Sequence, residues 1–198
     1  MYEPGDIGMS VFLMNGWMRY TDAGFININF PSQTELFLEA RVRPDTDDRA
    51  FVFWKESLCA GWSFSIVNQK YHPTFTNTPL DCEDNSFRDI NLGDVDTTNH
   101  STVAVHWNLV NETMKFWLDG AFLGSTEIES DGITAGRSPF RIGTDWQEEL
   151  NFTGEIDELH ISRNEPTSAA VAFRHLSFSG TAGTYGEREV LTQSDIGP

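Results

Sequence analysis

The fold is decided by residues 139–163, whose sequence is PFRIGTDWQEELNFTGEIDELHISR. Apolar and polar residues alternate on both sides of a Phe-Thr-Gly turn at 152–154, and the turn leads into GEIDEL at 154–159. A strand with one face against a core and the other toward solvent shows this period of two. The stretch therefore predicts β-strands rather than a helix.

Five other segments are strand-like and follow one another along the chain; they are residues 36–44, 51–55, 61–66, 103–107 and 114–120. Together with 139–163 they make the chain resemble the laminin-G-like, concanavalin-A-like jelly rolls, from about residue 22 to about residue 176. Members of that family are mostly binding and adhesion modules. They bind glycans, proteins or calcium, and some are spacers or virion parts. The resemblance implies the fold more specifically than the function.

The composition of the 198-residue chain supports the same fold. Its 15 Phe and 6 Trp lie in short segments separated by Gly, Asn, Asp and Pro, which suits two sheets packed face to face. We therefore predict an all-β fold, a two-sheet antiparallel jelly-roll sandwich with one short C-terminal helix. The helix is predicted at 166–176, with Asn164 as its cap and Pro166 in its first turn. Its inward-facing residues are expected to be Ala169, Ala170, Phe173 and Leu176.

The chain has no internal repeat, low-complexity block or linker, so we expect one domain. We divide it into an N-terminal segment at 1–20, which is either an assembly contact or a first strand, the jelly roll at 21–180, and a C-terminal tail at 181–198. Cys59 and Cys82 are too few for a disulfide scaffold and lack the spacing of metal ligands. Whether they pair with each other is left open.

The net charge of −17 arises from 30 acidic and 13 basic residues. Such a charge repels phosphate backbones and anionic lipids, so we expect neither nucleic acid nor membrane as a partner. It suits a solvated surface, a cation site or a basic protein partner. The first eight residues, MYEPGDIG, have no basic start and no long apolar run. We therefore expect either a product that stays in the cell until assembly or lysis releases it, or a chain whose signal has been removed.

A β-hairpin is predicted around the Asp-Gly dipeptide at 119–120, which is a strong two-residue turn signal. The turn places Phe116 opposite Leu123 on one side of the hairpin, and Trp117 with Phe122 on the other side. If exposed, these two rings could stack on the apolar face of a sugar. The alternative is that a loop or a terminal segment covers both rings.

Three other tryptophans, Trp17, Trp54 and Trp146, lie near predicted turns or strand ends, where an indole ring can stay partly in water. They are further candidates for ligand contact. Trp62 and Trp107 instead alternate with small or polar neighbours inside predicted strands, and we expect them in the core.

β-Glucanases with this jelly roll carry a strand motif that resembles Glu-x-Asp-x-Glu or Glu-x-Asp-x-x-Glu. Glu155 and Asp157 match its first two positions, but Leu159 or His160 stands in the third, where the acid/base carboxylate is needed. We therefore expect Glu155 to be structural. Its expected partners are turn amides or one of the strand arginines Arg41, Arg43 and Arg141. The sequence also shows no nucleophilic triad, phosphate-binding loop or zinc pair, so no catalytic residue is predicted.

Calcium is the one cofactor that the resemblance implies, because laminin-G-like domains often hold one ion at a sheet edge. Calcium binds oxygens, many of them loop carbonyls, so the sequence reveals only candidate carboxylates. These are Asp22, Asp131, Asp145 and Asp157, which lie near Gly-rich turns or in the closing strand. The alternative is that these aspartates cap turns and stay solvated.

Taken as a whole, the sequence predicts a non-enzymatic binding or structural module. We expect an exposed subunit of a larger assembly, such as a phage or viral capsid decoration protein, with a glycan-adhesion role and other protein subunits as partners. Such a chain would be a homo-oligomer or bound to a coat, on the surface of a virion or another particle. The second reading is an isolated lectin or adhesion domain of a secreted, extracellular protein, and the third is a glycan hydrolase or lyase.

Overall fold

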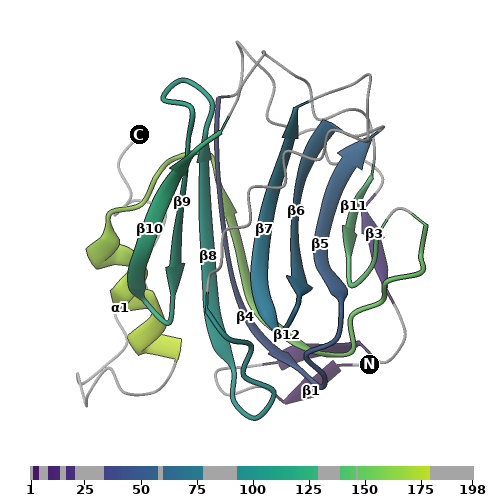
Figure 1. Cartoon of the computed structure of the whole chain (residues 1–198). Helices are drawn as coiled ribbons and strands as arrows, with labels where there is room; N and C mark the ends of the chain where they lie inside the picture. Colours follow the sequence, from purple (N-terminus) through teal and green to yellow (C-terminus); the bar gives the residue numbers. More distant parts are fainter. Residues whose placement is uncertain are drawn as a thin grey trace.

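The structure is a computed structural model that describes residues 2–4, 9–13, 17–20, 34–57, 60–77, 93–128, 139–145 and 147–178. Two antiparallel sheets face each other in these residues, and one helix lies outside them (Figure 1). The predicted all-β sandwich with a short C-terminal helix is confirmed. Cys59, Cys82, Asp22, Asp131 and Trp146 lie outside the described residues.

The larger sheet has seven strands in the order β1-β2-β12-β4-β8-β9-β10. Their bounds are β1 Tyr2–Pro4, β2 Met9–Leu13, β4 Glu35–Pro44, β8 Ser101–Asn108, β9 Thr113–Leu118, β10 Ala121–Glu127 and β12 Gly154–Ser162. The smaller sheet has five strands in the order β3-β11-β5-β6-β7. Their bounds are β3 Met18–Tyr20, β5 Ala50–Ser57, β6 Ala60–Val67, β7 Lys70–Asn77 and β11 Phe140–Ile142. Residues of the expected N-terminal segment thus supply one edge of each sheet.

The core fills the space between the sheets, because alternate residues of each strand point inward. Leu36, Leu38, Ala40 and Val42 of β4 are completely buried there, as are Trp62, Phe64 and Ile66 of β6. Trp62 of one sheet meets Trp107 of the other, with their ring centroids 5.3 Å apart. Both tryptophans therefore occupy the core as predicted.

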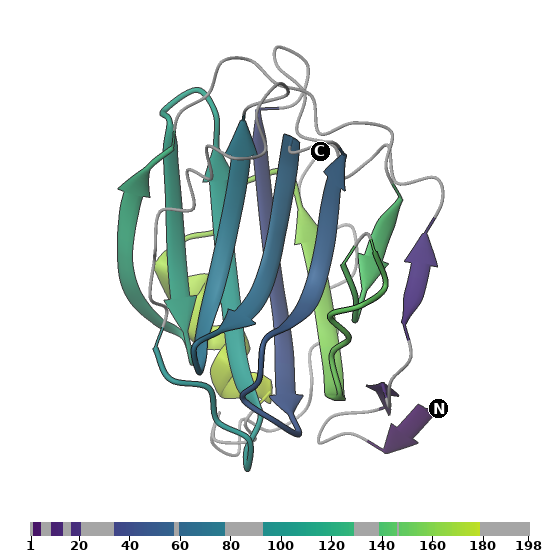
Figure 2. The ribbon, with the colours of Figure 1, turned by 45° about the vertical axis from the view of Figure 1, so that its right-hand side comes forward.

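Helix α1 (Ser168–Phe178) lies against the outer face of the seven-stranded sheet, behind both sheets in Figure 2. It begins two residues later than predicted, and the cap is Thr167 rather than Asn164, because the Thr167 hydroxyl accepts a hydrogen bond from the Ala170 amide at 3.2 Å. No helix of the described part of the chain is long and apolar enough to cross a membrane.

The predicted inward face of this helix is wrong. Ala169, Phe173 and Leu176 are exposed, Ala170 is half-buried, and Val171 is the buried residue. The reason is that α1 packs against the outer face of the sheet, which carries polar side chains, and not against the core. Arg174 therefore turns toward the sheet and forms an ion pair with the buried Glu39.

The predicted Asp-Gly turn is present at 119–120, with φ of 49° and 77°, and Phe122 pairs with Trp117 as expected. The pairing of Phe116 with Leu123 is wrong, since Phe116 lies opposite Gly124. A β-bulge between Phe122 and Gly124 inserts one residue and shifts the register. Turn rules set the first pairs of a hairpin but do not predict such an insertion.

Candidate functional site

Strand β11 brings two distant tryptophan positions to one end of the five-stranded sheet. It lies between β3 and β5, and Arg141 in β11 is opposite Arg19 on β3 and Trp54 on β5. Trp17 is the residue immediately before β3, and it is half-buried. Two tryptophans that are 37 positions apart in the sequence (17 and 54) therefore flank the same short strand.

The register also indicates the face on which these positions lie. Neighbouring Phe53 of β5 is completely buried in the core, and Ile142, its partner on β11, packs against the core. Because successive strand residues alternate between faces, Arg141 of β11 lies on the outer face of the sheet. The row of paired positions continues to Ser63 and Thr74, which are both buried.

The loop that follows β11 is fixed beside β5. The Asp145 carboxylate accepts hydrogen bonds from the amides of Glu149 at 3.0 Å and Leu150 at 3.5 Å. The Leu150 carbonyl in turn accepts a hydrogen bond from the Phe51 amide at 3.1 Å. Trp146 occurs in the sequence between Asp145 and Gln147 of this loop. We call Trp17, Trp54, Arg141 and residues 143–145 and 147–151 the tryptophan edge.

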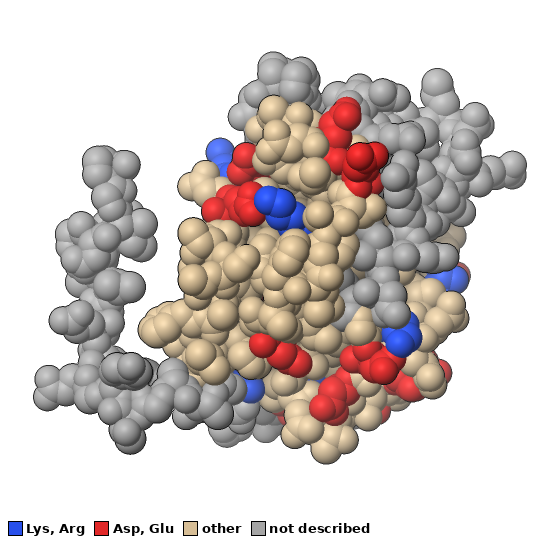
Figure 3. Space-filling view, turned by 60° about the vertical axis from the view of Figure 1, so that its left-hand side comes forward, with Lys and Arg blue, Asp and Glu red and all other residues tan. Residues whose placement is uncertain are grey.

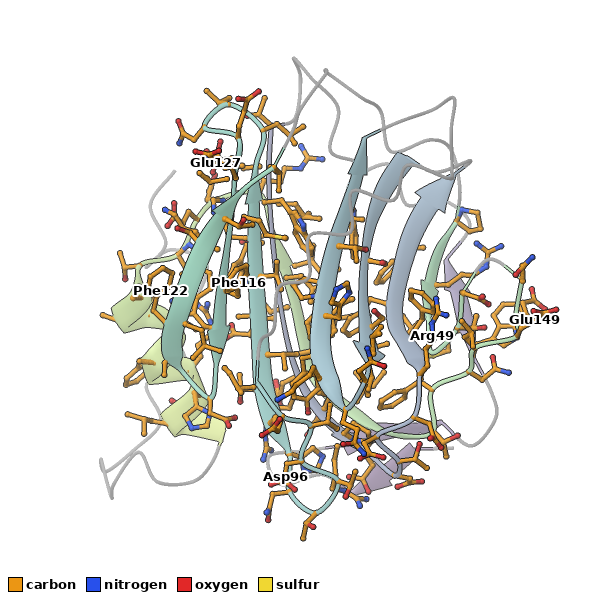
Figure 4. The ribbon with its side chains drawn as sticks, in the orientation of Figure 1. Arg49, Asp96, Phe116, Phe122, Glu127 and Glu149 are labelled. Carbon is orange, nitrogen blue, oxygen red and sulfur yellow. The ribbon has the colours of Figure 1, made fainter. Side chains whose placement is uncertain are left out.

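Three polar atoms of the tryptophan edge are buried without a hydrogen-bond partner. They are Arg141 Nε, Thr144 Oγ1 and Asn151 Oδ1. Most buried polar atoms in proteins are satisfied, so these three atoms are unusual, although atoms of the same kind also lie beneath α1, such as Glu39 Oε1 and Arg174 Nη2. The exposed Arg49 and Glu149 lie at the same end of the molecule (Figure 4). The edge therefore combines aromatic, cationic and neutral polar groups.

The other aromatic pair lies at the opposite side of the fold. Trp117 is only 1 % exposed, and its indole nitrogen donates a hydrogen bond to Ser168 Oγ of α1 at 3.3 Å. Phe122 is 50 % exposed, and its ring centroid is 5.5 Å from that of Trp117. The helix thus covers Trp117, whereas the alternative interpretation of this hairpin expected a loop or terminal segment to cover both rings. Only Phe122 of the pair remains open to a ligand.

Asp145 and Asp157 are the two calcium candidates within the described residues, and neither belongs to a cluster of metal-ligating side chains there. Within the described ranges, no group of three His, Cys, Asp or Glu residues could hold a metal ion. Asp145 is occupied with the loop amides, and the Asp157 carboxylate accepts a hydrogen bond from the Glu158 amide at 3.0 Å. Asp145 thus holds the loop after β11 and Asp157 bonds within the bulge of β12, where its Oδ2 is buried without a hydrogen-bond partner. Both aspartates are buried, so the alternative that they stay solvated is wrong for these two, and calcium binding by this chain stays a prediction.

The glucanase-like motif lies on β12 at the outer face of the seven-stranded sheet. Glu155 pairs with Arg43 of β4, as one of its expected partners, and His100 Nε2 lies 3.1 Å from its other oxygen. A bulge between Asp157 and His160 makes His160 the next residue that pairs with β4. Burial lowers the pKa of His160, and the Arg174 charge lowers it further. An imidazole rather than a carboxylate therefore occupies the third position of the longer motif.

The same outer face contains a buried histidine, His106 of β8, that the sequence analysis missed. His106 is fully buried, with Nε2 3.5 Å from Glu35 and Nδ1 3.7 Å from Glu165. Burial lowers the pKa of His106, while the two carboxylates act in the opposite direction. Lys115 also contacts Glu165, at 2.7 Å. These contacts fasten the segment before α1 to the sheet, and no local sequence signal reveals them because the partners are far apart in the chain.

The comparisons with known proteins agree with this fold. A family model described as the concanavalin A-like lectin/glucanases superfamily matches residues 21–172. No curated protein matches the chain by sequence. Among solved structures, the binding domain of Paraclostridial Mosquitocidal Protein 1 is similar with a TM-score of 0.67 at 15 % identity, over 90 % of this chain and 45 % of that chain.

Two further structures are similar. Domain 4 of AbnA, a GH43 extracellular arabinanase from Geobacillus stearothermophilus solved with arabinotriose, has a TM-score of 0.63 at 20 % identity, over 87 % of this chain and 79 % of that chain. The binding domain of botulinum neurotoxin DC, solved with rat synaptotagmin II, has a TM-score of 0.59 at 14 % identity, over 90 % and 42 %. This chain spans less than half of the two toxin chains. Identities this low establish a shared fold and nothing finer.

Proposed function

This chain belongs to the concanavalin A-like lectin/glucanases superfamily, and from that membership we propose that it is a non-catalytic carbohydrate-binding module. Domain 4 of the arabinanase, which shares the fold, was solved with arabinotriose. The observation that carries the proposal for this chain is the tryptophan edge, where Arg141 pairs with the Trp54 position on one side and the β3 strand that follows Trp17 lies on the other side.

The chemistry of the tryptophan edge suits a sugar. Indole rings stack on the C–H face of a pyranose or furanose ring, while the site around them needs a few polar groups to bind hydroxyls. The unpartnered atoms of Arg141, Thr144 and Asn151 supply one donor nitrogen, one hydroxyl and one amide oxygen. Because all three atoms are buried, a hydroxyl-bearing ligand would bond them only if the surrounding side chains moved.

The bonding of Glu155 supports a binding role rather than hydrolysis. A retaining mechanism needs two carboxyl groups about 5 Å apart, one free to attack and one to donate a proton. Glu155 is engaged with Arg43 and His100, and the third motif position is His160. We therefore assign the β12 carboxylates a role in holding the sheet.

A glycan array followed by calorimetry on the glycan that binds best tests this function. Trp17→Ala and Trp54→Ala should each weaken binding at least about fivefold, since a stacked aromatic ring contributes about 1–3 kcal/mol. Phe122→Ala is the matched control, because it removes an exposed ring far from the edge and should bind as wild type does. Absence of any glycan ligand would contradict the function. Unchanged binding by both tryptophan variants would contradict the site.

We keep a second candidate function, an exposed subunit of a larger particle such as a capsid decoration protein, on a virion surface or another extracellular surface. The observation that favours it is a group of exposed apolar side chains on β10 and α1. Co-purification of the chain with a larger coat would support this candidate, and a chain that never associates with protein would contradict it.

A further inference from the structure

Helix α1 docks by its polar side. Ser168 bonds Trp117, Arg174 bonds Glu39, and His175 Nδ1 lies 3.0 Å from Thr102 Oγ1. Val171 is the buried apolar residue on this face of the helix. At about 100° per residue, Phe173 points directly away from these docked residues. The helix therefore turns its largest apolar side chain outward, which is the reverse of an ordinary surface helix.

The exposed apolar side chains are gathered in one place. Of the six large hydrophobic residues that are exposed in the described ranges, four lie on β10 and α1. We call these four the apolar ridge: Phe122 (50 % exposed), Leu123 (47 %), Phe173 (63 %) and Leu176 (43 %). A side chain added at Gly120 would lie 3.0 Å from the Ala172 backbone, so the β9–β10 turn touches the helix. The four residues therefore lie on two elements that are in contact.

The ridge is almost free of carboxylates in a strongly acidic protein. The sequence of α1, SAAVAFRHLSF, contains no Asp or Glu, and β10 contains only Glu127, at its end. Figure 3 views this side of the molecule, where most charged side chains lie around an uncharged centre. Figure 4 shows Phe122 directed toward α1 and Glu127 at the far end of the strand.

The charge distribution indicates which partner fits. Two copies that each carry a net charge of −17 repel each other least where they meet through a surface with few carboxylates. The apolar ridge is such a surface, with Asp119 beside it, 3.9 Å from His175. A strongly basic partner would gain little from the four ridge residues, because none of them carries a carboxylate.

The bulge between Phe122 and Gly124 indicates how the contact is made. β10 is the last strand of its sheet in the described residues, and a regular edge could accept a strand from another molecule. A bulge breaks the spacing of the edge hydrogen-bonding groups and discourages this pairing. The contact therefore uses side chains rather than a shared sheet.

We propose that the apolar ridge is the interface between two copies of this chain, with α1 of one copy packed against α1 of the other around a two-fold axis. A two-fold interface places the same patch on both sides. Phe173 and Leu176 of one copy would therefore be buried against Phe173 and Leu176 of the other copy. The ridge and the tryptophan edge lie on opposite sides of the fold (Figure 1). A dimer would thus display two outward tryptophan edges, and if these bind glycan as proposed, the pair gains avidity on a multivalent surface.

Light scattering and sedimentation of the full chain across a range of concentrations test the interface. Wild type should approach about twice the mass of one chain and dissociate on dilution. Phe173→Glu and Leu176→Glu should each weaken self-association at least about tenfold, because each places a carboxylate at the axis. Val110→Glu is the matched control: Val110 is equally exposed but lies in the β8–β9 turn, and this variant should dimerise as wild type does.

Circular dichroism verifies that the variants fold, which their exposed positions favour. A wild-type monomer at every concentration overturns the interface, as does undiminished association in both glutamate variants. The Trp54→Ala variant distinguishes the two proposals, since it should dimerise normally but bind glycan more weakly. A dimer without glycan binding would leave the interface standing and remove the carbohydrate function.

Discussion

The outer face beneath α1 and the tryptophan edge differ in how their tryptophans are covered. Beneath α1, Trp117 is buried and donates a hydrogen bond to Ser168, and Arg174 forms an ion pair with the buried Glu39. At the tryptophan edge, Trp17 is only half-buried. Both regions contain buried polar atoms without a hydrogen-bond partner, such as Glu39 Oε1 and Arg141 Nε, so these atoms alone do not indicate a ligand site. The difference between the two regions is the helix that covers Trp117.

The largest effect on the face beneath α1 is expected when the ion-pair partner of Glu39 is removed. Arg174→Ala should leave a completely buried carboxylate without its cation and lower the free energy of unfolding by about 3 kcal/mol, measured by urea denaturation. Arg49→Ala removes an exposed arginine and serves as the control, with little change expected. Equal stability of the two variants would show that Glu39 does not need α1.

A smaller effect is expected from Gly120→Ala in the β9–β10 turn. The residue has φ of 77°, and a Cβ there would lie 3.0 Å from the Ala172 backbone, so either the turn or α1 must shift. We expect a loss of about 1–2 kcal/mol and a change in Trp117 fluorescence as the helix lifts. Ser125→Ala, on exposed β10, should change neither.

Acid should destabilise the outer face beneath α1 before it affects the tryptophan edge. The folded state lowers the pKa of His106 and His160, mainly through burial, whereas unfolding frees both imidazoles to take up protons. Stability contributed by the neutral histidines is thus present above the unfolded pKa, near 6.5, and is lost as the pH falls below it. Burial raises the pKa of Glu39, which acts in the opposite sense at lower pH.

Thermal unfolding of wild type and His106→Gln at pH 7.5 and pH 5.5 measures how much His106 contributes to the pH dependence of stability. The wild-type melting temperature should fall more between the two pH values than that of the variant, which retains His160 alone. A variant with the same fall as wild type would exclude His106 as a source of the pH dependence.

The smallest effect is expected for Phe122→Ser. Because half of this ring is already in water, its loss should cost about 1 kcal/mol or less, measured by urea denaturation. Glycan binding should not change. A glycan-binding defect in this variant would move the proposed site from the tryptophan edge to the neighbourhood of α1.

The sequence predicts those parts of the fold that depend on neighbouring residues. Alternation indicates the strands and the core positions of Trp62 and Trp107, and the Asp-Gly signal indicates the hairpin turn. The bulges on β10 and β12 were not predicted, because an inserted residue leaves no mark in the local pattern. The face that α1 buries was misjudged, since apolar spacing suggests a face but the surface that receives the helix decides it.

The candidate site was predicted only as separate residues. Trp17, Trp54 and Trp146 were each chosen because an indole near a turn can stay wet. Nothing local relates Trp17 to Trp54, which come together through the pairing of β11 with strands from two other parts of the chain. Long-range register therefore carries the part of the site that composition does not.

The contacts of α1 have a consequence for the order of events during synthesis. Its described bonds reach Trp117, 51 positions earlier, and Glu39, 135 positions earlier. A helix of 11 residues has little stability alone, so it must wait until the strands beneath it are in place. On the ribosome, Trp117 and Glu39 would stay accessible until residues 168–175 emerge, and in that interval a chaperone could bind the nascent sandwich at this face.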